Sequence, residues 1–502
     1  MIQPRGHEYP KQAIGVHPLA TLASFLEKPK GLLDDQWPPL QLQYLDQYLK
    51  ALGGQTVVIE DHYVDRDYVH DLSVFHARSL RSYPNYCHRF HFFKAAFDRS
   101  KWTTMLRAAA GGEREDVVRK LQETYLGFMV VRPLPGTPVG RTVLATLGVQ
   151  SDSGKIRAFG AIRDYVANVS GFRLKVSGLA FQQQDQAVSA CATAALWSAL
   201  HRVAPLEGLA VPTPAEITEG ASRYFLADGR TMPSEGLTVH QICEATRVAG
   251  LAPLVIRSVS IEHDRAQLHG YLRSGFAPVM AIQPTSGGSG HAVCGVGLKL
   301  GSVLPRTDMS VHFRDAATSV VGAYVHDDRL GPYAVAELFP RTHNTEVRTG
   351  LRIKWSDGVE SEESDLRAII VPVPKKLRLT IARLRQVAMF LAETIAEAFP
   401  SLSDVTFSCR YVTASDYRES AFTFGLSDDG IELLNTGVVL SRYLGLIELE
   451  ASGQPVCDIL VDTTEARPNP SILALLGRQG LPAGGEKTLQ IIAKNLGCQG
   501  IR

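Results

Sequence analysis

The chain has 502 residues, which is too long for a single hydrophobic core, so we expect two to four domains. Apolar residues make up 45% of the sequence and charged residues 21%, values that are typical of a globular protein. The formal net charge of +1 excludes a strong general attraction to nucleic acid or to an anionic membrane surface.

No apolar run is long enough to cross a membrane, and the first ten residues lack the apolar segment of a signal peptide. These features predict a cytoplasmic protein with neither a nucleic acid nor a membrane as its partner. No two of the seven cysteines have C-x-x-C spacing, which favours free thiols over a disulfide framework or a zinc ribbon. The cysteines are Cys87, Cys191, Cys243, Cys294, Cys409, Cys457 and Cys498.

The first predicted region, residues 1–172, mixes helices and strands and suggests no role. Apolar spacing and turn residues predict helices over Leu40–Leu52 and Arg114–Thr124, and strands over Gln55–Glu60 and Tyr125–Pro133. Carboxylates and imidazoles are dense over Glu60–Asp71, but their spacing fits no metal-ligand pattern. We therefore expect a solvated loop or charged face there, with no metal and no cofactor.

The second predicted region, residues 173–375, contains the candidate chemistry. A helix of about three turns is expected from Cys191 through Val203, and further helices and strands follow. The helices are expected over Pro214–Tyr224, Thr238–Ala249 and Ser260–Ser274, and the strands over Leu254–Val259, Phe276–Gln283, His291–Leu298 and Val320–His326.

The third predicted region, residues 376–502, is a further α/β unit whose sequence suggests no chemistry, and a regulatory or target-binding role is the expectation for it. It opens with a helix over Leu379–Phe399, followed by strands over Val405–Val412 and Tyr443–Leu449. Gln454–Asp462 is expected to complete a hairpin through Ser452-Gly453, and a short helix is expected after the turn at Arg467–Pro470.

Cys191 lies where a glutamine-rich loop becomes an apolar helix. The helix dipole and the unpaired N–H groups of a helix N-terminus both favour the thiolate, which is the nucleophilic form of cysteine. Downstream, the loop Gly287–Gly290 leads into an apolar strand that begins with His291, and a later strand ends in Asp327 and Asp328. A base beside the thiol and a polar group that fixes the base complete the arrangement needed for nucleophilic catalysis.

These motifs resemble the papain-like-fold cysteine peptidases, most closely their C39-like branch. His291 follows Cys191 by 100 residues and Asp327 follows His291 by 36, in the order of that family. The resemblance implies an α+β fold in which the cysteine helix packs on an antiparallel sheet. It also implies Cys191 as nucleophile, His291 as base and Asp327 as the group that orients the ring, with Asp328 as the alternative carboxylate. It covers the middle region only.

The resemblance also implies a glutamine that donates to the oxyanion, about six residues before the cysteine. Asp185 occupies that position, so the candidates are the flanking Gln184 and Gln186, with Gln186 slightly favoured. Ala192 is a second departure, because C39 members usually have glycine directly after the cysteine.

The sequence therefore predicts a cysteine peptidase that cleaves an amide bond of a protein or peptide through a thioester. Two alternatives stay open. A transglutaminase, deamidase or acyltransferase uses the same three groups with another acceptor, and a catalytically inactive binding module can keep the fold.

Overall fold

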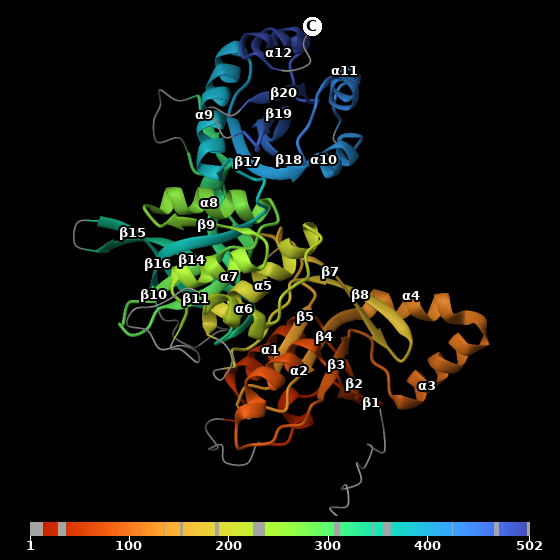
Figure 1. Cartoon of the computed structure of the whole chain (residues 1–502). Helices are drawn as coiled ribbons and strands as arrows, with labels where there is room; N and C mark the ends of the chain where they lie inside the picture. Colours follow the sequence, from red (N-terminus) through yellow and green to blue (C-terminus); the bar gives the residue numbers. More distant parts are fainter. Residues whose placement is uncertain are drawn as a thin grey trace, which may run out of the picture.

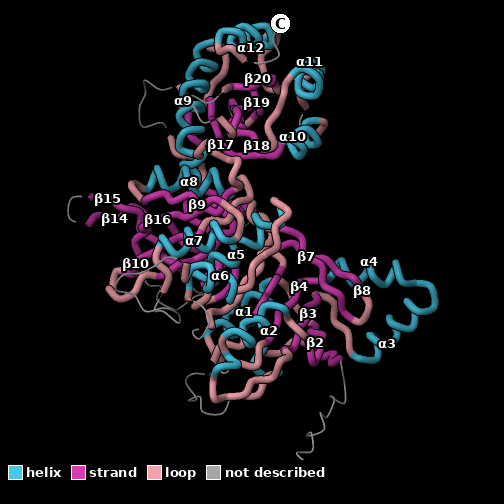
Figure 2. The backbone as a smooth tube through the Cα atoms, viewed as in Figure 1, coloured by secondary structure: helices cyan, strands magenta, loops and turns pink. Residues whose placement is uncertain are grey.

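The computed structural model shows a mixed α+β protein whose sheets are almost entirely antiparallel (Figure 1). Strands gather in each of the three regions, with helices packed around them (Figure 2). The structure describes residues 14–28, 37–134, 136–150, 154–185, 190–223, 236–305, 312–343, 346–354, 363–423, 425–465 and 471–498. Within those ranges, no helix is both long enough and apolar enough to cross a membrane.

The N-terminal region is built on a five-stranded antiparallel sheet in the order β1-β2-β3-β4-β5. The predicted helices at residues 40–52 and 114–124 and the two predicted strands are confirmed, whereas β1, β3, β5, α2 and α3 were not predicted. The strands are β1 (Ile14–Pro18), β2 (Thr56–Tyr63), β3 (Cys87–Phe93), β4 (Tyr125–Val131) and β5 (Val139–Leu144). The helices are α1 (Leu40–Ala51), α2 (Arg66–Val74), α3 (Arg99–Ala108) and α4 (Arg114–Thr124).

The acidic segment over residues 60–71 forms the end of β2 and most of α2, so the prediction of a solvated loop or face is wrong. Asp65 is buried, accepts hydrogen bonds from the first turn of α2 and binds Arg141 at 2.6 Å. Asp71 is also buried and accepts a hydrogen bond from the backbone N–H of Ala215 at 3.0 Å. These carboxylates can be buried because each accepts hydrogen bonds. The donor to Asp71 belongs to the middle region.

A separate hairpin, β7 (Arg163–Val169) and β8 (Phe172–Gly178), connects the first two regions. Its residues alternate between buried and exposed positions, which is the pattern of a strand pair with one covered face. The predicted boundary between residues 172 and 173 therefore falls inside this hairpin.

The middle region contains a sheet that closes on itself in the order β10-β11-β13-β14-β15-β16, because β16 also pairs with β10. Two further strands, β6 and β9, extend it at β11 and β16. The sequence did not predict β14, β15 and β16. The strands are β6 (Ile156–Ala158), β9 (Ala252–Arg257), β10 (Val279–Pro284), β11 (His291–Leu300), β13 (Val320–Asp327), β14 (Gly331–His343), β15 (Glu346–Lys354) and β16 (Glu363–Val373).

Helix α5 (Cys191–Leu206) packs against this closed sheet, mainly on β11. It is buried along almost its whole length, as its run of alanine, leucine and tryptophan requires. The other helices of the region are α6 (Pro214–Ala221), α7 (Val239–Val248) and α8 (Ile261–Arg273), close to their predicted positions. Thr213 and Thr238 begin α6 and α7 with side-chain caps.

The C-terminal region is a sheet in the order β12-β17-β18-β19-β20, to which the middle region contributes β12 (Phe313–Asp315), the one parallel strand of the described chain. The strands are β17 (Val405–Thr413), β18 (Tyr443–Ala451), β19 (Gln454–Asp462) and β20 (Ile472–Gly477), and the helices are α9 (Ile381–Ala398), α10 (Ala414–Ala421), α11 (Asp428–Glu432) and α12 (Gly485–Asn495). In Figure 1, α8 lies between this sheet and the closed sheet.

The hairpin through Ser452-Gly453 is confirmed, and both residues have the positive φ of a two-residue turn. The turn at residues 467–470 lies outside the described residues. The short helix predicted after it is wrong, because residues 472–477 form β20 and pair with β19. The alternation of apolar residues there is too short to separate a strand from a helix.

Candidate functional site

Cys191 is the first residue of α5, and Ala190 is the N-cap residue. The first backbone N–H groups of a helix have no acceptor within it, so the sulfur lies at the electropositive end of α5. All seven cysteines are free, and only Cys191 and Cys498 are not fully buried. Cys191 is therefore a partly exposed thiol at a helix N-terminus.

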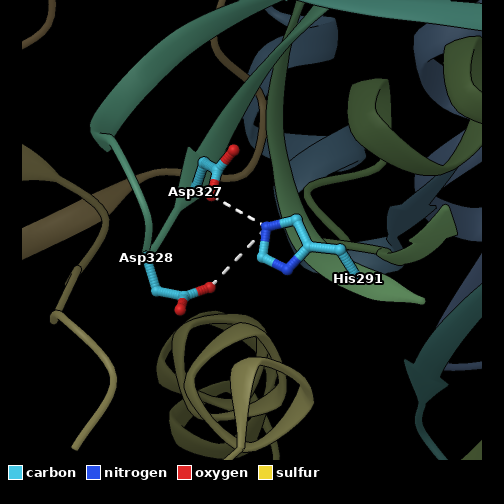
Figure 3. Close-up of side chains that lie close together, drawn as sticks. All are labelled: His291, Asp327 and Asp328. Atoms are coloured by element: carbon cyan, nitrogen blue, oxygen red, sulfur yellow. Dashed lines mark hydrogen bonds and ion pairs between the residues drawn. The ribbon is translucent and has the colours of Figure 1, made fainter. Parts of the chain in front are cut away.

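His291 begins β11, directly after the exposed glycine-rich loop, and its side chain is almost completely buried. Gly287 and Gly288 both have φ near +92°, a conformation that glycine adopts without strain. The Nε2–H of His291 donates a hydrogen bond to Oδ1 of Asp327 over 2.8 Å (Figure 3). The loop thus leads from the surface to a ring that is buried beside the carboxylate of Asp327.

Asp327 is the last residue of β13 and is buried. Its Oδ1 also accepts a hydrogen bond from the backbone N–H of Arg329 at 3.0 Å, which fixes the carboxylate in the turn. The Oδ1 of Asp328 lies 3.9 Å from Nε2 of His291, beyond hydrogen-bond distance (Figure 3). Of the two predicted carboxylates, Asp327 is the one that holds the ring.

The remaining ring nitrogen of His291, Nδ1, points away from Asp327 (Figure 3). Nδ1 is buried, and it has no hydrogen-bond partner of normal geometry among the described residues. Cys191 nevertheless interacts with the ring closely enough to raise the pKa of His291. Since Nε2 is occupied by Asp327, Nδ1 is the atom available to the sulfur.

The charge state of His291 follows from its neighbours. Burial lowers the pKa of this imidazole, but the charge and the hydrogen bond of Asp327, together with Cys191, raise it to about 10. Burial would raise the pKa of Asp327, but the charge and hydrogen bond of His291 hold it below its usual range. At neutral pH the pair is therefore an imidazolium and a carboxylate.

The N-terminal region contacts the turn that carries the two aspartates. The Nε2 of Gln41, on α1, donates to the backbone oxygen of Asp328 at 2.8 Å, and the hydroxyl of Tyr44 donates to that of Pro332 at 3.0 Å. A Cβ atom on Gly331 would lie 2.1 Å from the Tyr44 ring, so only glycine permits this approach. Helix α1 thus supports the position of the carboxylates from outside the middle region.

Asp328 has a different electrostatic environment from Asp327. Its burial and the neighbouring charge of Asp327 raise its pKa to about 6, even though His291 acts in the opposite direction. It therefore remains partly protonated in mildly acidic solution, where Asp327 is ionised.

The loop before Cys191 carries a polar pair that the sequence did not predict. Asp185 Oδ2 lies 2.7 Å from Nε2 of His76, which belongs to a short 3-10 helix of the N-terminal region, and both side chains are buried. The only sequence signal was Asp185 itself, a carboxylate where the family pattern has glutamine. Gln184 is half-buried, and Gln186 lies outside the described residues.

His291, Asp327 and Asp328 also offer three ligand atoms within 4.8 Å of one another. Zinc holds nitrogen and oxygen ligands at about 2.0–2.2 Å, so two ligands of a tetrahedral site lie more than about 3 Å apart. The 2.8 Å between Nε2 and Oδ1 is the length of a charge-assisted hydrogen bond. The geometry fits a shared proton better than a metal ion.

These pKa shifts predict how stability depends on pH. The pKa of His291 is about 10 in the folded protein and about 6.5 when unfolded, so its stabilising contribution is complete below pH 6.5 and is lost as pH rises to 10. One such group changes the free energy of unfolding by at most about 1.4 kcal/mol per pH unit. The contribution of Asp327 is lost only as pH falls below its usual range.

We expect the Asp327→Asn variant to lose much of this alkaline dependence, because the main cause of the raised His291 pKa is removed. Urea denaturation of both proteins between pH 6 and 10 measures the difference. Parallel curves for the two proteins would contradict the assignment of the shift to Asp327.

A comparison with protein-family models and with curated proteins finds no match for this chain, so the functional argument depends on the geometry of the site.

Proposed function

We propose that this protein is a cysteine peptidase with a papain-like, C39-like middle domain over residues 173–375. One observation carries the proposal. A buried imidazolium is held at Nε2 by Asp327 and acted on by Cys191, which begins a helix packed on the same sheet. This is the relation of nucleophile, base and orienting group that acyl-transfer chemistry requires.

In the proposed reaction, the Cys191 thiolate attacks the carbonyl carbon of a peptide bond. The oxyanion receives hydrogen bonds from the Cys191 backbone N–H and from Gln184 or Gln186, and loss of one such donor typically costs about 10²–10³ in rate. The His291 imidazolium donates its Nδ1 proton to the leaving amine. His291 then accepts a proton from water as the water hydrolyses the thioester, which restores Cys191.

Asp327 contributes orientation and charge in this scheme. Its hydrogen bond to Nε2 sets which ring nitrogen faces the sulfur, and its negative charge stabilises the imidazolium. Asp185, at the position where the family has glutamine, pairs with His76. This contact engages the Asp185 carboxylate, which leaves Gln184 and Gln186 as the proposed donors.

The experiment that tests the proposal is covalent labelling with iodoacetamide at pH 7, followed by peptide mass spectrometry. We expect Cys191 to be alkylated fastest, and Cys191→Ser to abolish that label together with cleavage of a peptide library. Cys498→Ser is the matched control, because Cys498 is also partly exposed but burial raises its pKa to about 11. An inert Cys191, or cleavage that survives in Cys191→Ser, would refute the proposal.

The products identify the acceptor of the acyl group. Two peptides whose masses sum to the substrate plus water indicate hydrolysis. An intact substrate with a gain in mass or a one-dalton shift indicates acyl transfer or deamidation by the same three residues.

A further inference from the structure

A cleft of about 350 Å³ lies where the middle region meets the C-terminal region. It is lined by residues from α5, from the end of α8, from β17 and from α10. Three arginines face it, namely Arg202, Arg273 and Arg410, and one carboxylate, Asp416. Arg202 follows Cys191 by eleven residues on α5, or about 16 Å along the helix axis, so the cleft is distinct from the candidate active site.

Two of the arginines have protein partners. Arg273 and Arg410 both bind Glu448 at 3.1 Å, and Arg273 also donates to Ser408 at 2.7 Å. These contacts join α8 to β17 and β18 and stabilise the shape of the cleft. Glu448 balances only one of these two positive charges, and Arg202 adds a further positive charge to the cleft.

Arg202 has no protein partner among the described residues, neither a hydrogen-bond acceptor nor an ion pair, and its Nε is buried without an acceptor. Burial and the nearby charge of Arg163 lower the pKa of Arg202, and the charge of Asp416 opposes this shift only in part. A guanidinium has five donors in a planar fork, and a half-buried one without an acceptor is costly. A bound anion would remove that cost.

The absence of a side chain at Gly275 leaves space in the cleft for the guanidinium of Arg202. Gly275, at the end of α8, has φ +79°, and a Cβ atom there would lie 3.0 Å from Nη2 of Arg202. The hydroxyls of the wall are already used, since Ser274 accepts from the backbone N–H of Tyr411 at 2.7 Å and Thr413 caps α10. These two hydroxyls are therefore engaged, whereas the Arg202 guanidinium has no acceptor among the described residues.

We propose that this cleft binds a small molecule that bears a phosphate group, with Arg202 as its main ligand. A guanidinium fork matches two phosphate oxygens, and Arg163, Arg273 and Arg410 add positive potential around it. The volume is at the lower end of the range for small-molecule sites, which suits a compact phosphate monoester rather than a polymer. The inference does not depend on the proposed peptidase activity.

The test measures the binding of inorganic phosphate and of pyrophosphate to the full chain. Binding is monitored by ³¹P NMR at low ionic strength. We expect saturable binding that is at least 10-fold weaker in Arg202→Gln and unchanged in Arg247→Gln, an exposed arginine on α7. Absence of saturable binding of both anions, or equal affinity of wild type and Arg202→Gln, would overturn the proposal.

A second measurement needs no variant, so it holds even if Arg202→Gln fails to fold. Phenylglyoxal modifies accessible arginines, and mass spectrometry locates each adduct. Pyrophosphate is expected to slow modification of Arg202 at least several-fold while leaving Arg247 unaffected. Equal rates at Arg202 with and without pyrophosphate would contradict the assignment.

Discussion

Replacing His291 by alanine is expected to lower the rate of peptide cleavage by at least about 10³-fold, and to lower the free energy of unfolding by about 3–5 kcal/mol. The rate falls because the sulfur loses its proton acceptor and the leaving amine loses its donor. The stability falls because Asp327, which is buried and ionised, loses the partner that holds its charge. Steady-state kinetics and urea denaturation at pH 7 measure the two effects.

A His291→Gln variant separates the two losses. Its side-chain amide can still donate a hydrogen bond near Asp327, so we expect a smaller loss of stability but an equal loss of rate, because an amide does not transfer protons at neutral pH. His269→Ala is the control for a buried histidine elsewhere. Burial lowers the pKa of His269 to about 3, so it is neutral, and its removal should not change kcat. Activity retained in His291→Gln would contradict its role as base.

Much of the helical structure could be predicted because its signals are local. Helix α1 ends before Gly53, which has φ +77°, and α9 has an apolar face that repeats at helical spacing. Helix α5 was predicted from the change between a polar loop and an apolar run. Each of these signals lies within the element that it describes or directly beside it, so no knowledge of the rest of the fold was needed.

The closed sheet could not be predicted in the same way. Its closure depends on pairing between β10 and β16, which are about 80 residues apart in the sequence, and no local pattern encodes that register. Strands β14 and β15 carry charged residues at several positions, and Glu337 on β14 forms an ion pair with Lys354 on β15. Such strands lack the apolar alternation on which strand prediction depends.

The contact between His291 and Asp327 was predictable because both residues occur in motifs that could be compared with a known family. The contacts that hold these two residues in place were not predictable. Gln41 and Tyr44 are about 290 residues from the turn that they bind, and Asp71 is 144 residues from Ala215. These side chains lie at ordinary helix positions, and only tertiary packing gives them their role.

The pair of His76 and Asp185 provides the last strong prediction. Replacing His76 by alanine is expected to lower the free energy of unfolding by about 1–3 kcal/mol, because it removes a buried hydrogen-bond partner of the Asp185 carboxylate. The replacement also removes one of the contacts between the N-terminal region and the segment before Cys191, while the hydrogen bonds of Gln183 to Arg132 and Gly136 remain. We therefore expect slower alkylation of Cys191 in the folded variant, which peptide mass spectrometry measures.

His88→Ala is the matched control for this prediction, because His88 binds Asp61 at 2.8 Å, almost the same distance as in the buried pair. The side chains of that pair are 41% and 30% exposed, so water can replace the lost contact and the expected cost is below about 1 kcal/mol. A double-mutant cycle with His76→Ala and Asp185→Ala isolates the pair. The double variant should be less destabilised than the sum of the single variants, because each single variant already removes the contact between the two side chains. Simple additivity would show that the two side chains contribute independently, and that Asp185 does not need His76 to stay buried.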